Sequence, residues 1–130
     1  MKNLVILLGC LLIGNVFSEV SEAVKRAPDN YQVALRSKNP AVVESAIFYS
    51  VKLKLFYQDQ DCEKLQNELK NLSVNGKSET IRFKAFLAGY YLNTPEMLAK
   101  IEKINYKDSN LFFQMLADTL QAKILADRSE

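Results

Sequence analysis

The sequence contains no histidine and no tryptophan, and among its 130 residues there are only four glycines, three prolines and two cysteines. Without histidine the chain cannot form a Ser-His-Asp or Cys-His nucleophilic site, and most protein zinc sites are excluded as well. The glycines form no glycine-rich loop that would hold a phosphate group. Because no pair of carboxylates stands out as a hydrolytic pair either, we expect that the protein is not an enzyme.

The acidic residues do not form a recognisable metal site. Asp59, Asp61 and Glu63 lie close together in the sequence. They lack the glycine at the sixth position and the glutamate at the twelfth position of the calcium-binding loop. Acidic side chains are also expected where a helix begins, because the N-terminal end of a helix is electropositive. We therefore expect neither a metal nor an organic cofactor.

The first 18 residues have the pattern of an export signal. Lys2 precedes an apolar run over residues 4–17, and Val16 and Ser18 suit the −3 and −1 positions of a cleavage site before Glu19. A retained membrane anchor is the alternative, but this run covers 14 positions, whereas a spanning helix needs about 20 residues. The pattern therefore favours a cleaved signal peptide and a mature protein that is exported to the periplasm or secreted.

A further alternative for the same segment is lipid attachment at Cys10. The stretch Leu7-Leu8-Gly9-Cys10 resembles the bacterial lipobox, in which the cysteine becomes the lipidated first residue. Only residues 4–9 precede this cysteine as an apolar core, and residues 11–13 continue the apolar run instead of beginning a polar tether. A lipid-anchored protein is therefore the less favoured alternative.

The charges of the mature chain are nearly balanced. Removal of the signal removes Lys2 and no acidic residue, which leaves 16 basic and 15 acidic side chains. Nucleic-acid-binding proteins usually concentrate a clear excess of basic residues. We therefore expect no nucleic-acid partner, and membrane contact only through the signal segment.

A single cysteine, Cys62, remains after cleavage. The exported domain therefore has no internal disulfide, and packing alone must hold the fold. Cys62 falls in the expected first turn of a helix, where the helix dipole lowers the pKa of a thiol. Because no histidine is present to activate it, we interpret Cys62 as a small apolar residue that contacts a neighbouring helix.

Capping residues and prolines divide the mature chain into helices. Asn39-Pro40 and Thr94-Pro95 each combine an N-cap side chain with proline at the first helical position. Asn75-Gly76 ends a helix, with a glycine suited to the left-handed stop. Further N-cap candidates are Asp59 or Asp61, Ser78, and Asp108 or Ser109. The predicted helices cover residues 40–57, 61–74, 79–92, 95–104 and 109–126, after a shorter amphipathic stretch over 19–37 that breaks at Pro28.

Strands find little support in the sequence. Residues 51–55 alternate between apolar residues and lysine, as a short strand would. They lie, however, inside a segment of helical length that begins with a helix cap at Asn39. A helix is therefore predicted here.

Long helices recur along the chain at a spacing near 34 residues. Glu44 and Glu79 are 35 positions apart, and so are Phe48 and Phe83. Each long helix except the last is followed by a shorter one. This rhythm is typical of helical-hairpin repeats.

The segment over residues 79–92 has apolar residues on two faces. The two faces are Phe83, Phe86, Leu87 and Tyr90 on one side and Ile81, Ala85, Ala88 and Leu92 on the other. An internal helix of a hairpin stack has neighbours on two sides and is apolar on both. We therefore expect Phe86 to lie in the core, where Phe86→Ala would destabilise the protein by about 3–5 kcal/mol.

The helix rhythm over roughly residues 40–126 resembles that of the tetratricopeptide and HEAT helical-hairpin repeat proteins. The fragment AGYYL at residues 88–92 is similar to part of the tetratricopeptide consensus, although the chain lacks the tryptophan of that consensus. The chain also resembles small uncharacterised exported bacterial proteins that carry a HEAT-like domain. The resemblance implies an all-α fold, built as a short right-handed stack of antiparallel helical hairpins with about five or six helices after the signal. It also implies an interaction scaffold, and it transfers no functional residue.

These observations predict three segments. They are a signal peptide over residues 1–18, a short N-terminal helical segment over 19–38, and a helical-hairpin domain over 39–130. The predicted role is a non-enzymatic protein–protein interaction module of the bacterial envelope, with an unknown protein partner. Self-association through the first hairpin is a further hypothesis, because a short repeat has an exposed end.

The predicted binding surface consists of Tyr49, Tyr57 and Tyr91. A tyrosine side chain combines an apolar ring with a polar hydroxyl, which suits the rim of a core and a binding face equally. The competing function is therefore a carrier of a small apolar or lipid-like ligand, held in an aromatic-lined groove.

Overall fold

The computed structural model describes residues 22–129, and within this range every regular element is a helix. The predicted all-α fold is confirmed. The signal segment, the cleavage site before Glu19 and Cys10 lie outside the described residues. Among the residues described, no helix is both long and apolar enough to cross a membrane.

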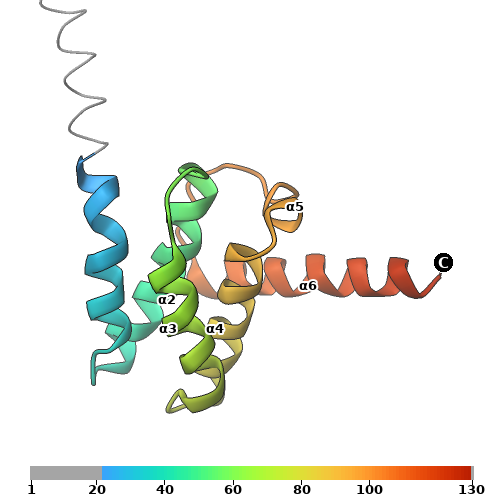
Figure 1. Ribbon diagram of the computed structural model, residues 1–130. Helices are drawn as coiled ribbons and strands as arrows, with labels where there is room; N and C mark the ends of the chain where they lie inside the picture. The colour runs from blue at the N-terminus through green and yellow to red at the C-terminus, as the bar shows by residue number, and fades with distance from the viewer. Residues whose placement is uncertain (1–21, 130) are drawn as a thin grey trace, which may run out of the picture.

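Residues 22–129 form six helices and the loops that connect them, which Figure 1 shows. The first covers residues 22–35 and is called the N-terminal helix below. The others are α2 (Pro40–Phe56), α3 (Glu63–Asn75), α4 (Glu79–Leu92), α5 (Pro95–Leu98) and α6 (Ser109–Arg128). The helix α4 packs against both α2 and α3, and α6 crosses the bundle and projects beyond it toward the C-terminus.

Three predicted N-caps are confirmed by their hydrogen bonds. The side chains of Asn39, Ser78 and Asp108 accept hydrogen bonds from the backbone N–H groups of Ala41, Ile81 and Leu111, over 3.0, 3.1 and 3.1 Å. These bonds satisfy backbone donors that the first turn of a helix leaves without a partner. The sequence signals therefore fix the starts of α2, α4 and α6.

Two predicted boundaries are wrong. The N-terminal helix continues through Pro28, because Ala27, Pro28 and Leu35 are buried and their packing outweighs the hydrogen bond that proline cannot donate. The helix α5 ends at Leu98, not near residue 104. The segment that follows it is held by the ammonium group of Lys52, which donates hydrogen bonds to Asn105 Oδ1 and to the Tyr106 carbonyl.

The expected left-handed stop at Gly76 is also wrong. The backbone of Gly76 has a φ of −58° and a ψ of 148°, which any residue can adopt. A Cβ atom at this position would lie 2.6 Å from the Leu72 carbonyl oxygen and 2.9 Å from the Ile81 Cγ2 atom. Glycine is therefore needed for the close approach of α3 and α4, not for its conformational freedom.

The core lies where α2, α3, α4 and the first half of α6 meet. Its fully buried side chains include Ile47, Val51, Leu55, Leu65, Leu69, Ala85, Ala88, Tyr91, Phe112 and Leu116. The predicted small-residue face of α4 is confirmed, since Ile81, Ala85, Ala88 and Leu92 are all buried. Both members of the Phe112-Phe113 pair are buried, because both rings lie against Phe48 of α2 and the Phe112 ring also lies against Tyr106.

The other predicted face of α4 is buried only in part. Leu87 is buried, but Phe83 is 53% exposed and Phe86 is 51% exposed. The helix α6 crosses α4 and covers Leu87, while the two phenylalanines remain at the edge of this crossing. The prediction that Phe86 is a core residue is therefore wrong.

The 35-residue spacing does not correspond to a structural repeat. Val51 is fully buried, whereas Phe86, which lies 35 positions later, is half exposed. Phe56 is 41% exposed, whereas Tyr91 at the same spacing is fully buried. The described helices thus give no evidence for a tetratricopeptide-like or HEAT-like repeat, and the right-handed stacking of hairpins stays a prediction.

Candidate functional site

An apolar groove of about 240 Å³ lies between the N-terminal helix and α2. We call it the aromatic groove. Its lining residues are Ala23, Val24, Ala27, Tyr31, Tyr49, Lys52, Leu53, Phe56 and Tyr57. Two of the three tyrosines predicted as a binding surface, Tyr49 and Tyr57, are thus brought together here.

Helical periodicity places these side chains on facing stripes. On α2, Tyr49, Leu53 and Phe56 recur at intervals of four and three residues, which puts them on one side of the helix. On the N-terminal helix, Val24, Ala27 and Tyr31 do the same. The ring centroids of Tyr31 and Tyr49 lie 6.2 Å apart across the groove, within the usual range for an aromatic pair.

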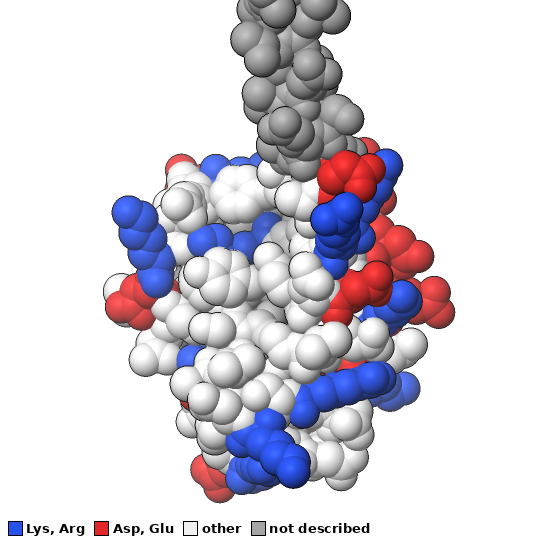
Figure 2. All heavy atoms as spheres, turned by 90° about the vertical axis from the view of Figure 1, so that its left-hand side faces the viewer, with Lys and Arg blue, Asp and Glu red and all other residues white. Residues whose placement is uncertain are grey.

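The groove keeps a large part of its aromatic surface in contact with solvent. Tyr49 is 46% exposed, Phe56 is 41% exposed and Tyr57 is 42% exposed. Figure 2 views the molecule from the side of the N-terminal helix and shows uncharged side chains across the middle of this face, with acidic and basic side chains mostly around its margin. Aromatic side chains that stay partly exposed around one groove are characteristic of an interaction site.

Lys52 supplies a fixed positive charge beside the rings. Its Nζ atom donates hydrogen bonds to Asn105 Oδ1 over 2.8 Å and to the Tyr106 carbonyl over 2.7 Å. The same atom lies 5.5 Å from the centroid of the Tyr49 ring, within the range of a cation–π contact. Desolvation by burial, together with the nearby charge of Lys107, lowers the pKa of Lys52.

Tyr31 remains a neutral hydrogen-bonding group at the wall of the groove. Burial raises the pKa of its hydroxyl, and the proximity of Tyr49 raises it further. A neutral tyrosine hydroxyl can both donate and accept a hydrogen bond. The groove therefore combines aromatic surface, a neutral hydroxyl and one ammonium group, which suits the binding of an apolar segment with polar backbone groups.

Tyr91 does not belong to this surface, and the sequence prediction for it is wrong. Its side chain is fully buried, and its hydroxyl donates a hydrogen bond to the Leu116 carbonyl over 2.7 Å. Burial, and secondarily the proximity of Tyr90, raises the pKa of Tyr91 to about 12. The physical reason is that α6 packs over this side of α4, so Tyr91 joins the two helices inside the core.

We expect Tyr91→Phe to lower the free energy of unfolding by about 1 kcal/mol near neutral pH, because the hydrogen bond to Leu116 is lost. The wild-type protein should also lose stability relative to the variant as pH rises from about 10 to about 12, because the unfolded chain ionises this tyrosine first. Chemical denaturation of both proteins across this pH range tests the prediction. Tyr57→Phe is the matched control. An identical pH dependence of stability for the wild-type protein and Tyr91→Phe would contradict the prediction.

Cys62 is buried at the start of α3. It occupies the N-cap position of α3, and its side chain is 2% exposed. Burial, as the largest cause, raises the pKa of its thiol. The interpretation of Cys62 as a small apolar packing residue is confirmed. Within residues 22–129, no three side chains of the metal-ligating types lie close enough together to hold an ion.

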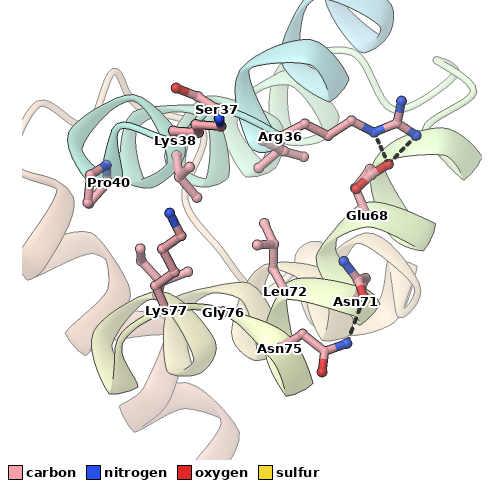
Figure 3. Close-up of a pocket in the computed structure, with 13 residues that line it drawn as sticks. Arg36, Ser37, Lys38, Pro40, Glu68, Asn71, Leu72, Asn75, Gly76 and Lys77 are labelled. Carbon is pink, nitrogen blue, oxygen red and sulfur yellow. Dashed lines mark hydrogen bonds and ion pairs between the residues drawn. The ribbon is translucent and has the colours of Figure 1, made fainter.

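A second cleft, of about 260 Å³, lies near the turn between α3 and α4 (Figure 3). Arg36 at the end of the N-terminal helix donates a hydrogen bond to Glu68 of α3, and Asn75 donates one to Asn71. These polar groups therefore already have hydrogen-bond partners within the protein, and the contact between Arg36 and Glu68 joins the end of the N-terminal helix to α3. The remaining charge of the cleft comes from Lys38 and Lys77 at the surface.

Sequence reasoning missed a third hollow, which lies between α4 and α6 and has a volume of about 310 Å³. We call it the α4–α6 groove. Its lining residues are Phe83, Phe86, Leu87, Ala117, Leu120, Gln121, Ile124, Leu125 and Arg128. The sequence feature that could have predicted this groove is the Ile124-Leu125 pair near the end of the last helix. A terminal helix with a single buried face would be expected to carry a polar residue at one of these two positions.

Comparisons of the chain with protein-family models, with curated proteins and with solved structures find no match. The case for a function therefore depends on the side chains themselves. Two of the hollows in the described range, the aromatic groove and the α4–α6 groove, are lined mainly by apolar and aromatic side chains, and such surfaces bind through shape and hydrophobic contact.

Proposed function

We propose that the protein is an exported, non-enzymatic protein-binding module of the bacterial envelope, and that the aromatic groove receives an apolar segment of its partner. One observation carries this proposal. Tyr49, Phe56 and Tyr57 remain 41–46% exposed although they surround a single groove. Partly exposed aromatic side chains that gather in one place are enriched at protein interfaces and contribute much of their binding energy.

The dimensions of the groove favour a peptide segment as the ligand. A hollow of about 240 Å³ accommodates a few apolar side chains, as in the docking of a short helix into a groove. Tyr31 and Lys52 offer a hydroxyl and an ammonium group beside this apolar surface. We therefore expect a partner segment with two or three apolar residues on one face and an acidic residue or an accessible carbonyl next to them.

Export of the protein is supported by the residues that precede the described range. The basic start, the apolar run over residues 4–17 and the small residues before Glu19 form the pattern of a secretory signal. The groove begins only four residues after Glu19, at Ala23. The proposed partner is therefore an envelope or secreted protein.

A carrier of a small apolar or lipid-like ligand is the second candidate, because the groove is lined by aromatic rings. Its volume lies below the 300–1,000 Å³ or so that is usual for a small-molecule pocket. A lipid chain would therefore be covered only in part. Mass spectrometry of an organic extract of the purified protein would distinguish the two candidates, since a carrier would release a stoichiometric ligand.

The proposed function can be tested by crosslinking in living cells. A photoreactive phenylalanine analogue is placed at Tyr57 in the full chain, and at Val74 of α3 as the control, because Val74 is 72% exposed and does not line the groove. We expect one dominant crosslinked protein from position 57 and none from position 74. The additional change Tyr49→Glu should abolish that crosslink, and an unchanged yield would contradict the proposal.

A further inference from the structure

The α4–α6 groove exposes four large apolar side chains to solvent. Phe83 is 53% exposed, Phe86 is 51% exposed, Ile124 is 47% exposed and Leu125 is 55% exposed. All four line the same groove. Isolated apolar residues on a surface are normal, whereas four large ones around one hollow indicate an interaction surface.

The position of α6 makes this surface accessible. The helix projects past the rest of the bundle toward its C-terminus (Figure 1). The groove residues of α6 follow one stripe at 117, 120, 121, 124, 125 and 128. This spacing is the pattern of a helix that packs along another helix.

We infer that the α4–α6 groove is covered by a second copy of the chain, with the two α6 helices antiparallel about a two-fold axis near residues 122 and 123. In this arrangement the stripe matches itself, because Leu120 meets Leu125 of the other copy, and Gln121 meets Ile124. Self-complementarity of this kind is what a two-fold interface requires. The Phe83 and Phe86 rings then flank the paired helices on both sides.

The charges at the two ends of the stripe select this orientation. Arg128 lines the groove near the C-terminal end of α6, and Asp118 lies next to Ala117 at the other end. Both residues are exposed. In this register each Arg128 lies opposite Ala117 of the other copy and within one residue of its Asp118, whereas parallel pairing would place like charges together. A matched pair of opposite charges fixes the register and orientation of an interface.

This inference concerns a different face from the one that binds the proposed partner, so neither depends on the other. It also differs from self-association through the first hairpin, because α4 and α6 form the opposite part of the chain. The two surfaces together describe a protein that presents two aromatic grooves per dimer. A partner with repeated segments would bind such a dimer with increased avidity.

The test is the molar mass of the purified protein in solution. Light scattering coupled to size-exclusion chromatography, from about 1 to about 200 μM, should give twice the mass of one chain at the upper concentrations. Leu125→Glu should raise the dissociation constant of the dimer at least about 100-fold, because the two-fold axis places the charge in the interface twice. Because Leu125 is 55% exposed in the single chain, the variant should fold normally, which circular dichroism would verify.

Charge reversal tests the orientation. Asp118→Arg and Arg128→Asp should each raise the dissociation constant by about tenfold, and the double variant should restore it to within about threefold. Val74→Glu and Tyr57→Ala are controls that should leave the dimer unchanged. A monomer at every concentration, a dimer that Leu125→Glu does not weaken, or a double reversal without recovery would each overturn the inference.

Discussion

Replacing Phe112 with alanine is expected to lower the free energy of unfolding by about 3–5 kcal/mol, the cost of a large truncation inside a well-packed core. Phe112 is 1% exposed. Its ring centroid lies 5.4 Å from that of Phe48 and 4.7 Å from that of Tyr106. The side chain thus joins the start of α6 to α2 and to the loop that precedes α6. The cavity left by alanine would be lined by aromatic rings that cannot close it without moving whole helices.

The matched control is Phe86→Ala, which removes the same atoms from a side chain that is 51% exposed. This change should cost about 1 kcal/mol or less, because half of the ring already contacts water. Urea denaturation at about 1 μM protein measures both variants with little contribution from self-association. If both variants lowered the free energy of unfolding equally, the two phenylalanines would not differ in burial as the structure describes.

The contrast between Phe86 and Phe112 shows what the sequence can and cannot predict. Both residues belong to apolar helical patterns, and periodicity alone treats them alike. Their burial is decided by the angle at which α6 crosses α4, which depends on many distant contacts. Helix starts were predictable because a cap such as Asn39 or Ser78 acts on backbone groups only two or three residues away.

The glycine and proline signals were ambiguous for a related reason. Gly76 was correctly placed at the end of α3, but the sequence cannot distinguish a left-handed turn from a close contact with Leu72 and Ile81. The sequence predicts a break at Pro28, because the cost of proline in a helix is local, whereas the burial of Pro28 that compensates for it depends on tertiary packing. Glycine and proline therefore indicate where a helix can end, and tertiary packing decides whether it ends there and in which backbone conformation.

The candidate site was predicted in part. Tyr49 and Tyr57 were identified because tyrosine suits a surface that is both apolar and polar, and both lie in the aromatic groove. Tyr31 also lines the groove, but it lies on the N-terminal helix, and no sequence pattern connects it with Tyr49 and Tyr57. Tyr91 was misplaced because adjacent residues on a helix point about 100° apart, and the sequence does not show which of the two α6 covers.

Lys84 is a residue whose importance only the structure reveals. A lysine in an amphipathic helix is normally interpreted as solvent-facing, yet Lys84 is 6% exposed. Its Nζ atom lies 3.2 Å from Glu44 Oε1 of α2 and 2.8 Å from Asn110 Oδ1 of α6. It also lies 5.4 Å from the centroid of the Phe113 ring. A single ammonium group therefore connects α4 to both α2 and α6.

We expect Lys84→Ala to lower the free energy of unfolding by about 2–3 kcal/mol, because a buried stem and charge-assisted hydrogen bonds are lost together. The loss stays below that of a completely buried ion pair, since the side chain of Glu44 is 35% exposed and can be hydrated. Lys84→Met retains the stem and should lose only about 1–2 kcal/mol. Chemical denaturation at neutral pH measures these differences.

The control for Lys84 is Lys64→Ala, which removes an ion pair of similar geometry from the surface. Lys64 lies 2.7 Å from Asp29, and both side chains are more than half exposed. Water screens such a pair, so its removal should leave stability unchanged within error. If Lys84→Ala were equally silent, the ammonium group would not join the three helices. If Lys84→Met were as damaging as alanine, the charge itself, rather than the packing of its stem, would hold α4 against α2 and α6.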